Sequence, residues 1–103
     1  MNINEIAKRA YKRALERGKI TEVSSPTAQY AECAECAESL KDEFCELLGA
    51  SEDTSSEHLS EYSEVQEEIT DILIVCLTEL YRRNDNVERI IMRKIDYNDK
   101  RID

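Results

Sequence analysis

The sequence predicts an all-α protein, and three observations support that prediction. Its 103 residues include only two glycines and one proline, so few positions interrupt a helix. Apolar residues recur at helical spacing in several segments, and the alternation typical of strands is hard to find. The length suits one domain and leaves no room for a second core. We therefore predict a single helical domain over residues 1–103.

The first predicted helix begins after an N-cap at Asn2 or Asn4 and ends at Gly18. Apolar residues follow one side of it at helical spacing, while lysines and arginines cover the other side. The apolar positions are Ile3, Ile6, Ala7, Ala10 and Ala14, and the basic positions are Lys8, Arg9, Lys12 and Arg13. This segment is predicted to be an amphipathic helix that buries one face.

The second predicted helix begins at Pro26 and runs to about Leu48. Ser25 is placed as its N-cap, because proline directly after a capping serine suits the first helical position. Gly49 ends the helix, since glycine is favoured just past a helix C-terminus. Residues 49–61 follow as a polar connection rich in serine and acidic residues, which is expected to be mobile.

The third predicted helix runs from near Ser60 to about Arg83 and is the most apolar. Its stripe comprises Ile69, Ile72, Leu73, Cys76, Leu77 and Leu80, with Ile74 and Val75 on the remaining sides. A helix that is apolar nearly all round is buried on several sides, and a chain this short encloses it poorly. We therefore predict a core completed by oligomerisation, as a homodimer or homotetramer.

A turn at residues 84–86, with the sequence NDN, precedes the fourth predicted helix and supplies its cap. Its apolar residues share one face of the helix. They are Val87, Ile90, Ile91 and Ile95. The four predicted helices thus account for nearly the whole chain.

Charge is distributed unevenly along the chain, whose formal net charge is −9. Residues 1–19 carry +4 and residues 82–103 carry +2, so residues 20–81 carry −15. Such an acidic stretch repels itself unless a cationic group lies against it, either the basic ends or bound metal. The same balance argues against a nucleic-acid-binding protein, which normally presents a basic face.

Four cysteines raise the question of a disulfide scaffold, but the surrounding sequence favours a reducing compartment. Met1 is followed at once by charged amphipathic sequence, with no apolar signal segment. No run approaches the length needed to span a bilayer. We expect a cytoplasmic protein with thiols and without a membrane partner. The mid-helix CxxC of Cys33 and Cys36 lacks the second pair or nearby histidine of a zinc site, so these cysteines are interpreted as small buried apolar residues.

Pairs of carboxylates lie beside the apolar stripes of the second and third helices. Glu32 and Glu35 are three residues apart, and Glu68 and Asp71 repeat that spacing. A residue advances about 100° around a helix, so each pair borders the apolar stripe of its own helix. If those faces meet, four carboxylates converge, and their repulsion is offset by a hard divalent cation such as Mg²⁺. The sequence therefore predicts a metal site.

These residues resemble the ExxE…ExxD signature of the all-α nucleoside triphosphate pyrophosphatases, the MazG-like and dCTP-pyrophosphatase group. The segments AECAESL and EEITDILIVCLTEL are similar to family segments, and KIDYNDKR resembles the family's K-x-x-x-N-x-x-R ending. The likeness extends over roughly residues 4–102. One departure is Ala31, because many relatives carry a further glutamate directly before the first pair.

The resemblance implies a four-helix MazG-like bundle assembled from two or four chains. It further implies that Glu32, Glu35, Glu68 and Asp71 bind Mg²⁺, or Mn²⁺ as an alternative ion, and that a nucleoside triphosphate is hydrolysed to a monophosphate and pyrophosphate. Lys94, Asn98 and Arg101 are then expected to bind the substrate. Glu38 is a candidate outer-shell ligand or general base. His58, alone in the polar connection, is expected to be solvated.

Two other functions stay open at this stage. A phosphoribosyl-ATP pyrophosphohydrolase shares the fold and the metal motif but acts on a different nucleotide. A non-catalytic helical oligomer would retain the acidic seam as an interaction surface or a structural metal site. The base and the sugar that the substrate carries do not follow from these residues.

Overall fold

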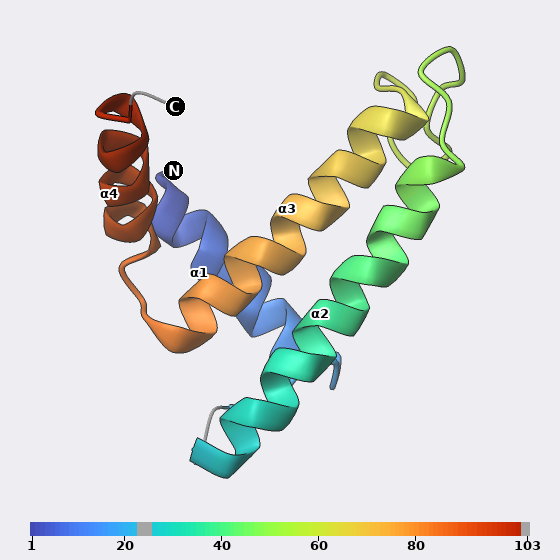
Figure 1. Cartoon of the computed structure of the whole chain (residues 1–103). Helices are drawn as coiled ribbons and strands as arrows, with labels where there is room; N and C mark the ends of the chain where they lie inside the picture. Colours follow the sequence, from blue (N-terminus) through green and yellow to red (C-terminus); the bar gives the residue numbers. More distant parts are fainter. Residues whose placement is uncertain (23–25, 102–103) are drawn as a thin grey trace. The chain divides into compact units, whose positions relative to one another are not determined.

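The computed structural model describes residues 1–22 and 26–101, with the backbone alone for residues 26–31. These residues form four α-helices and no strand (Figure 1). The helices are α1 (Ile3–Glu16), α2 (Pro26–Leu48), α3 (Glu64–Arg83) and α4 (Val87–Asp99). The predicted all-α class and the four helices are confirmed. Within the described ranges, none of the helices combines the length and hydrophobicity that crossing a membrane requires.

The chain divides into two compact units. The terminal unit joins residues 1–22 with residues 77–103, and the central unit is residues 23–76. The terminal unit contains thirteen Lys and Arg and nine Asp and Glu, whereas the central unit contains one lysine and fourteen Asp and Glu. The acidity inferred from the sequence is therefore concentrated in one unit.

In the terminal unit, α1 has defined caps at both ends. The Asn2 side chain accepts a hydrogen bond of 2.9 Å from the backbone N–H of Glu5, which identifies Asn2 as the N-cap. Gly18 follows the helix with a φ of 69°, and its N–H donates to the carbonyl of Leu15. The N–H of Lys19 donates to the carbonyl of Ala14, which completes a Schellman motif.

The other candidate cap, Asn4, joins α1 to the start of α4. Its Oδ1 accepts a hydrogen bond of 2.7 Å from the backbone N–H of Glu88. Its Nδ2 donates to the side chain of Asn86, which is itself the N-cap of α4. Asn4 therefore satisfies one of the N–H groups that the first turn of a helix leaves without an intrahelical partner.

Small and apolar residues form the core of the terminal unit. Ala7, Leu77 and Val87 are buried there, one each from α1, α3 and α4. Four partly buried residues pack against them, namely Ile3, Leu80, Tyr81 and Ile91. The guanidinium of Arg82 is also buried and lies 3.3 Å from the Glu79 carboxylate. A core of this size buries little of the apolar surface that the sequence provides.

In the central unit, α2 and the first part of α3 lie side by side and antiparallel (Figure 1). The predicted end of α2 at Leu48 is confirmed, and the predicted cap Ser25 lies outside the described residues. The third helix begins at Glu64 rather than near Ser60. Ser63 and Gln66 explain the difference, because each side chain bonds the backbone N–H of the other in a capping box.

The connection between α2 and α3 is held by hydrogen bonds, in contrast to the mobile segment that its composition suggested. Ser55 and Ser63 form an isolated antiparallel bridge. Ser56 is buried and donates its N–H to the Tyr62 carbonyl at 2.8 Å. Serine side chains of the connection accept hydrogen bonds from its backbone: Oγ of Ser51 accepts from the N–H of Asp53, and Oγ of Ser56 accepts from the N–H of Leu59.

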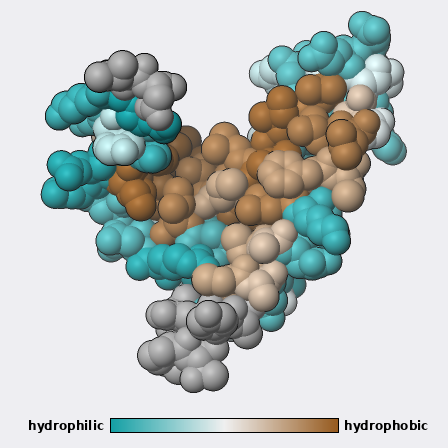
Figure 2. Space-filling model, viewed as in Figure 1, coloured by the Kyte–Doolittle hydropathy of each residue, from teal (hydrophilic) through white to brown (hydrophobic). Residues whose placement is uncertain are grey.

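Large apolar residues of the central unit remain at the surface of the single chain. Figure 2 shows hydrophobic surface, in brown, along the α3 side of this unit. Ile69 is 52% exposed and Leu73 is 51% exposed, although both belong to the predicted stripe of α3. Leu59 and Tyr62 of the connection and Ile69 line a pocket of about 480 Å³. This apolar face has no partner within the described part of the chain.

Candidate metal site

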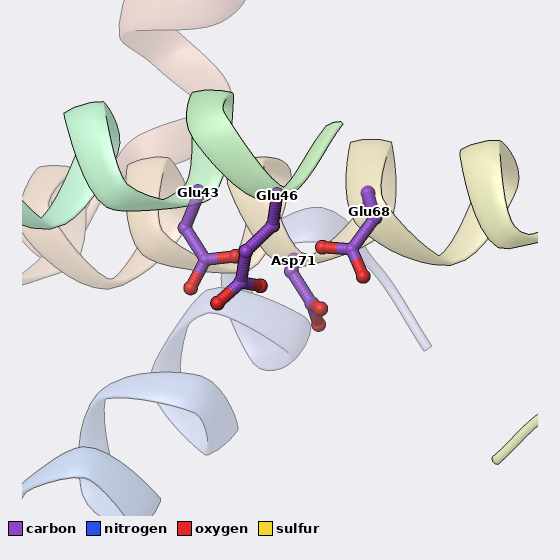
Figure 3. Close-up of side chains that lie close together, drawn as sticks. All are labelled: Glu43, Glu46, Glu68 and Asp71. Atoms are coloured by element: carbon purple, nitrogen blue, oxygen red, sulfur yellow. The ribbon is translucent and has the colours of Figure 1, made fainter. Parts of the chain in front are cut away.

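Four carboxylates converge in the central unit. Glu43 and Glu46 project from the last two turns of α2, and Glu68 and Asp71 project from the second turn of α3 (Figure 3). One oxygen from each carboxylate lies within 4.8 Å of the others. Glu46 is exposed and the other three residues are partly buried. The antiparallel arrangement produces this convergence, because it brings the end of α2 next to the start of α3.

The structure corrects which residues of α2 face Glu68 and Asp71. We predicted Glu32 and Glu35, whereas Glu43 and Glu46 occupy these positions. A helix rises 1.5 Å per residue, so Glu35 lies about 16 Å along α2 from Glu46. Glu32 is buried and Glu35 is exposed, both several turns away from the cluster. Glu43 and Glu46 have the same i, i+3 spacing as the predicted pair, but they lie nearer the end of α2.

Glu68 has the most perturbed environment in the cluster. Its pKa is raised, first by partial burial and then by the charge of Asp71 and by a hydrogen bond and charge repulsion from Glu46. Its Oε2 is buried and has no hydrogen-bond partner among the described residues. A buried carboxylate oxygen without a donor is unfavourable unless a proton or a cation satisfies it.

The donor set fits a hard divalent cation. Mg²⁺ takes oxygen ligands, and one or two carboxylates plus water are enough to bind it. The cluster supplies four carboxylates and no nitrogen or sulfur ligand. A cation would neutralise the repulsion that raises the pKa of Glu68 and would give its buried oxygen a partner.

Glu67, next to Glu68 in sequence, is not a member of the cluster. Its Oε2 accepts a hydrogen bond of 2.7 Å from the Ser56 hydroxyl, and its Oε1 lies 2.8 Å from Nδ1 of His58. These contacts lower the pKa of Glu67, with the Ser56 bond as the largest cause, and raise the pKa of His58. His58 is exposed, as expected, but it contacts a carboxylate that the sequence analysis left without a role.

The predicted substrate-binding residues lie in the terminal unit. Lys94 and Asn98 belong to α4, and Nζ of Lys94 lies 4.7 Å from the centre of the Tyr97 ring. Arg101 follows the helix, because α4 ends at Asp99, so it does not continue the same helical face. The role of these three residues stays a prediction.

Glu38 and the cysteines lie outside the cluster. Glu38 is exposed on α2, about 12 Å along the helix from Glu46. Cys33 is exposed and Cys36 is partly buried in the single chain, which corrects their interpretation as buried apolar residues. Cys45 is exposed and Cys76 is partly buried. All four lie in the described residues and none forms a disulfide.

Comparisons of the chain with protein-family models, with curated proteins and with solved structures found no match. The geometry of the carboxylate cluster, together with the motif spacing, is therefore the basis on which a function is proposed.

Proposed function

We propose that this protein is a Mg²⁺-dependent nucleoside triphosphate pyrophosphohydrolase whose metal ligands are Glu43, Glu46, Glu68 and Asp71. The observation that carries the proposal is the convergence of four carboxylates from two antiparallel helices within 4.8 Å. Mn²⁺ is the alternative ion, because it shares the preference of Mg²⁺ for carboxylate and water ligands.

The pair Glu43 and Glu46 keeps the motif spacing of the resemblance, although the similar segment AECAESL lies earlier on α2. Glu43 and Glu46 keep the ExxE spacing ahead of the ExxD of Glu68 and Asp71. Asp42 directly precedes Glu43, at the position where many relatives carry a further glutamate and where the predicted pair has Ala31, so the chain offers a shorter carboxylate there. Asp42 therefore replaces Glu38 as the candidate for an outer-shell carboxylate.

In the proposed reaction, the four carboxylates of α2 and α3 would hold the ion. The ion, when bound, would lower the pKa of a bound water and neutralise charge on the triphosphate oxygens. Lys94 and Arg101 are proposed to contribute positive charge for the phosphates, which an acidic surface alone would repel. The exposed apolar face of α3 supports a homo-oligomer in which a second chain covers it.

The test is release of pyrophosphate from a panel of ribonucleoside and deoxyribonucleoside triphosphates with Mg²⁺, with Mn²⁺ and with a chelator. Activity should require the ion and should be lost in Glu68→Gln and Asp71→Ala but kept in Cys33→Ala. Turnover of phosphoribosyl-ATP alone would assign the related histidine-pathway activity instead. A folded protein inert towards every nucleotide would contradict the proposal and leave a non-catalytic helical module.

A further inference from the structure

A network of hydrogen bonds fastens the connection onto the first turn of α3. The hydroxyl of Ser56 donates to Glu67 at 2.7 Å and accepts from the backbone N–H of Leu59 at 3.0 Å. Ser56 is 2% exposed, so its hydroxyl is buried and both bonds are partly shielded from water. A buried hydroxyl with two bonds of this length fixes its partners closely, because breaking either bond leaves a buried polar group unsatisfied.

A second carboxylate holds the other end of the connection. Oε1 of Glu64 accepts a hydrogen bond of 3.0 Å from the backbone N–H of Ser51, which lies just beyond the end of α2. The backbone N–H of Glu64 donates to the Thr54 carbonyl at 2.9 Å. Glu64 and Glu67 therefore bind the connection both near α2 and at its centre. We refer to these bonds of Glu64 and Glu67 as the register clamp.

The register clamp and the metal cluster share one side of α3. With about 100° of rotation per residue, Glu64, Glu67 and Asp71 all lie within about 100° of Glu68. The connection is thus fixed on the side of α3 that presents the two ligands. A shift of α2 along α3 by one helical turn would move Glu46 by about 5.4 Å. The four carboxylate oxygens lie within 4.8 Å of one another, so such a shift would separate Glu46 from Glu68 and Asp71.

We propose that Glu67, through its hydrogen bond with Ser56, is a positioning residue that sets the register of α2 against α3 and thereby holds the four carboxylates at ion-binding distance. This inference rests on the proposed metal site. Glu67 is not one of the four clustered carboxylates, so its effect on ion binding would be transmitted through the connection to Glu46 and Glu43.

The experiment measures Mn²⁺ affinity by electron paramagnetic resonance, with Mn²⁺ alone as the probe. Glu67→Ala and Glu67→Gln form a matched pair, because both remove one negative charge but only glutamine keeps an oxygen that accepts from Ser56. We expect Glu67→Ala to bind Mn²⁺ about tenfold or more weakly than Glu67→Gln, as is typical for loss of a group that orients metal ligands. Ser56→Ala should show a similar loss, and Ser60→Ala, in the same connection, should bind as the unmodified chain does.

The outcomes separate this inference from the proposed function. Equal Mn²⁺ affinity in Glu67→Ala and Glu67→Gln, with an unaffected Ser56→Ala, would overturn the positioning role while leaving the metal site intact. If Glu67→Ala and Ser56→Ala lowered the unfolding temperature but left the Mn²⁺ affinity unchanged, Ser56 and Glu67 would contribute to stability alone. That result would also overturn the positioning role. An unmodified chain that binds no Mn²⁺ would overturn the proposed site first, and the positioning role with it.

Discussion

Glu43 and Glu46 are the residues on which the proposed site differs from the sequence-based expectation. Which carboxylates of α2 face Glu68 and Asp71 depends on their position along α2, and the i, i+3 spacing alone does not identify them. Several acidic pairs at i, i+3 occur on α2, and each of them satisfies the same motif. A single substitution in each pair therefore distinguishes them experimentally.

We expect Glu46→Gln to weaken Mg²⁺ binding by more than the roughly 10–100-fold that loss of an outer-shell partner costs. Pyrophosphate release should fall accordingly. Glu35→Gln, an identical change on an exposed residue of the same helix, should leave both unchanged. Calorimetric titration with Mg²⁺ measures ion binding by Glu46→Gln and Glu35→Gln, and the nucleotide assay measures their release of pyrophosphate. If Glu35→Gln instead weakened Mg²⁺ binding and Glu46→Gln did not, the result would support Glu32 and Glu35 as the ligands from α2.

His58 allows a test of the connection in solution. Its pKa should lie above the ordinary value of 6.5, because its hydrogen bond with Glu67 favours the protonated ring. The stabilisation from this pair is therefore fully present below pH 6.5 and is lost as the pH rises through the pKa of the folded protein. On the acidic side, the pKa of Glu67 is lowered, so its contribution is fully present above its ordinary pKa of 4.5 and is lost as the pH falls through the lowered pKa of the folded protein.

The measurement is an NMR titration of the single histidine ring. Its pKa should fall towards 6.5 in Glu67→Gln and stay raised in Glu61→Gln, a matched change on an exposed residue of the connection. An unchanged histidine pKa in Glu67→Gln would show that the contact between His58 and Glu67 does not persist in solution.

At the scale of the elements, side-chain caps decide where α1, α3 and α4 begin. The capping box of Ser63 and Gln66 starts α3 directly ahead of two of the proposed ligands, Glu68 and Asp71. We expect Ser63→Ala to lower the free energy of unfolding by about 1 kcal/mol, because the N–H of Gln66 loses its acceptor. Ser60→Ala, which changes a serine upstream of the helix, should leave the free energy of unfolding nearly unchanged. Urea denaturation followed by circular dichroism measures both, and equal stabilities would exclude the cap as a source of stability.

The helices themselves could be predicted because their signals are local. Asn2, Gly18 and Gly49 mark helix ends by their own chemistry, and the structure places all three at or next to the expected boundary. The start of α3 was misplaced because the serines of the connection offer several possible caps. Only the glutamine three residues after Ser63 identifies the one that is used.

The register of α2 against α3 was not predictable from the motif, because it depends on the folded length of the connection. In an antiparallel pair, residues near the end of the first helix meet residues near the start of the second. Glu68 and Asp71 lie in the second turn of α3, so their partners had to lie close to Leu48. This argument from helix ends selects Glu43 and Glu46 over Glu32 and Glu35, but only once the connection is known to fold compactly between the two boundaries.

At the scale of the whole molecule, the exposed apolar face of α3 predicts self-association. Ile69 and Leu73 expose about half of their surface in the single chain. We expect the unmodified protein to sediment as a dimer or tetramer and Ile69→Asp to sediment as a monomer, because burying a carboxylate in an apolar interface is costly. Tyr97→Asp, at an exposed residue of α4, is the control. A monomeric unmodified protein at micromolar concentration would contradict this prediction.

The exposed thiol of Cys45 lies between two of the proposed ligands in sequence, yet about 130° around α2 from the side that they share. An environment-sensitive dye attached to this cysteine would leave the four carboxylates unobstructed while remaining on the same turns of helix. With Cys33, Cys36 and Cys76 replaced, one native position would then give an optical readout of ion binding without the introduction of any new reactive group.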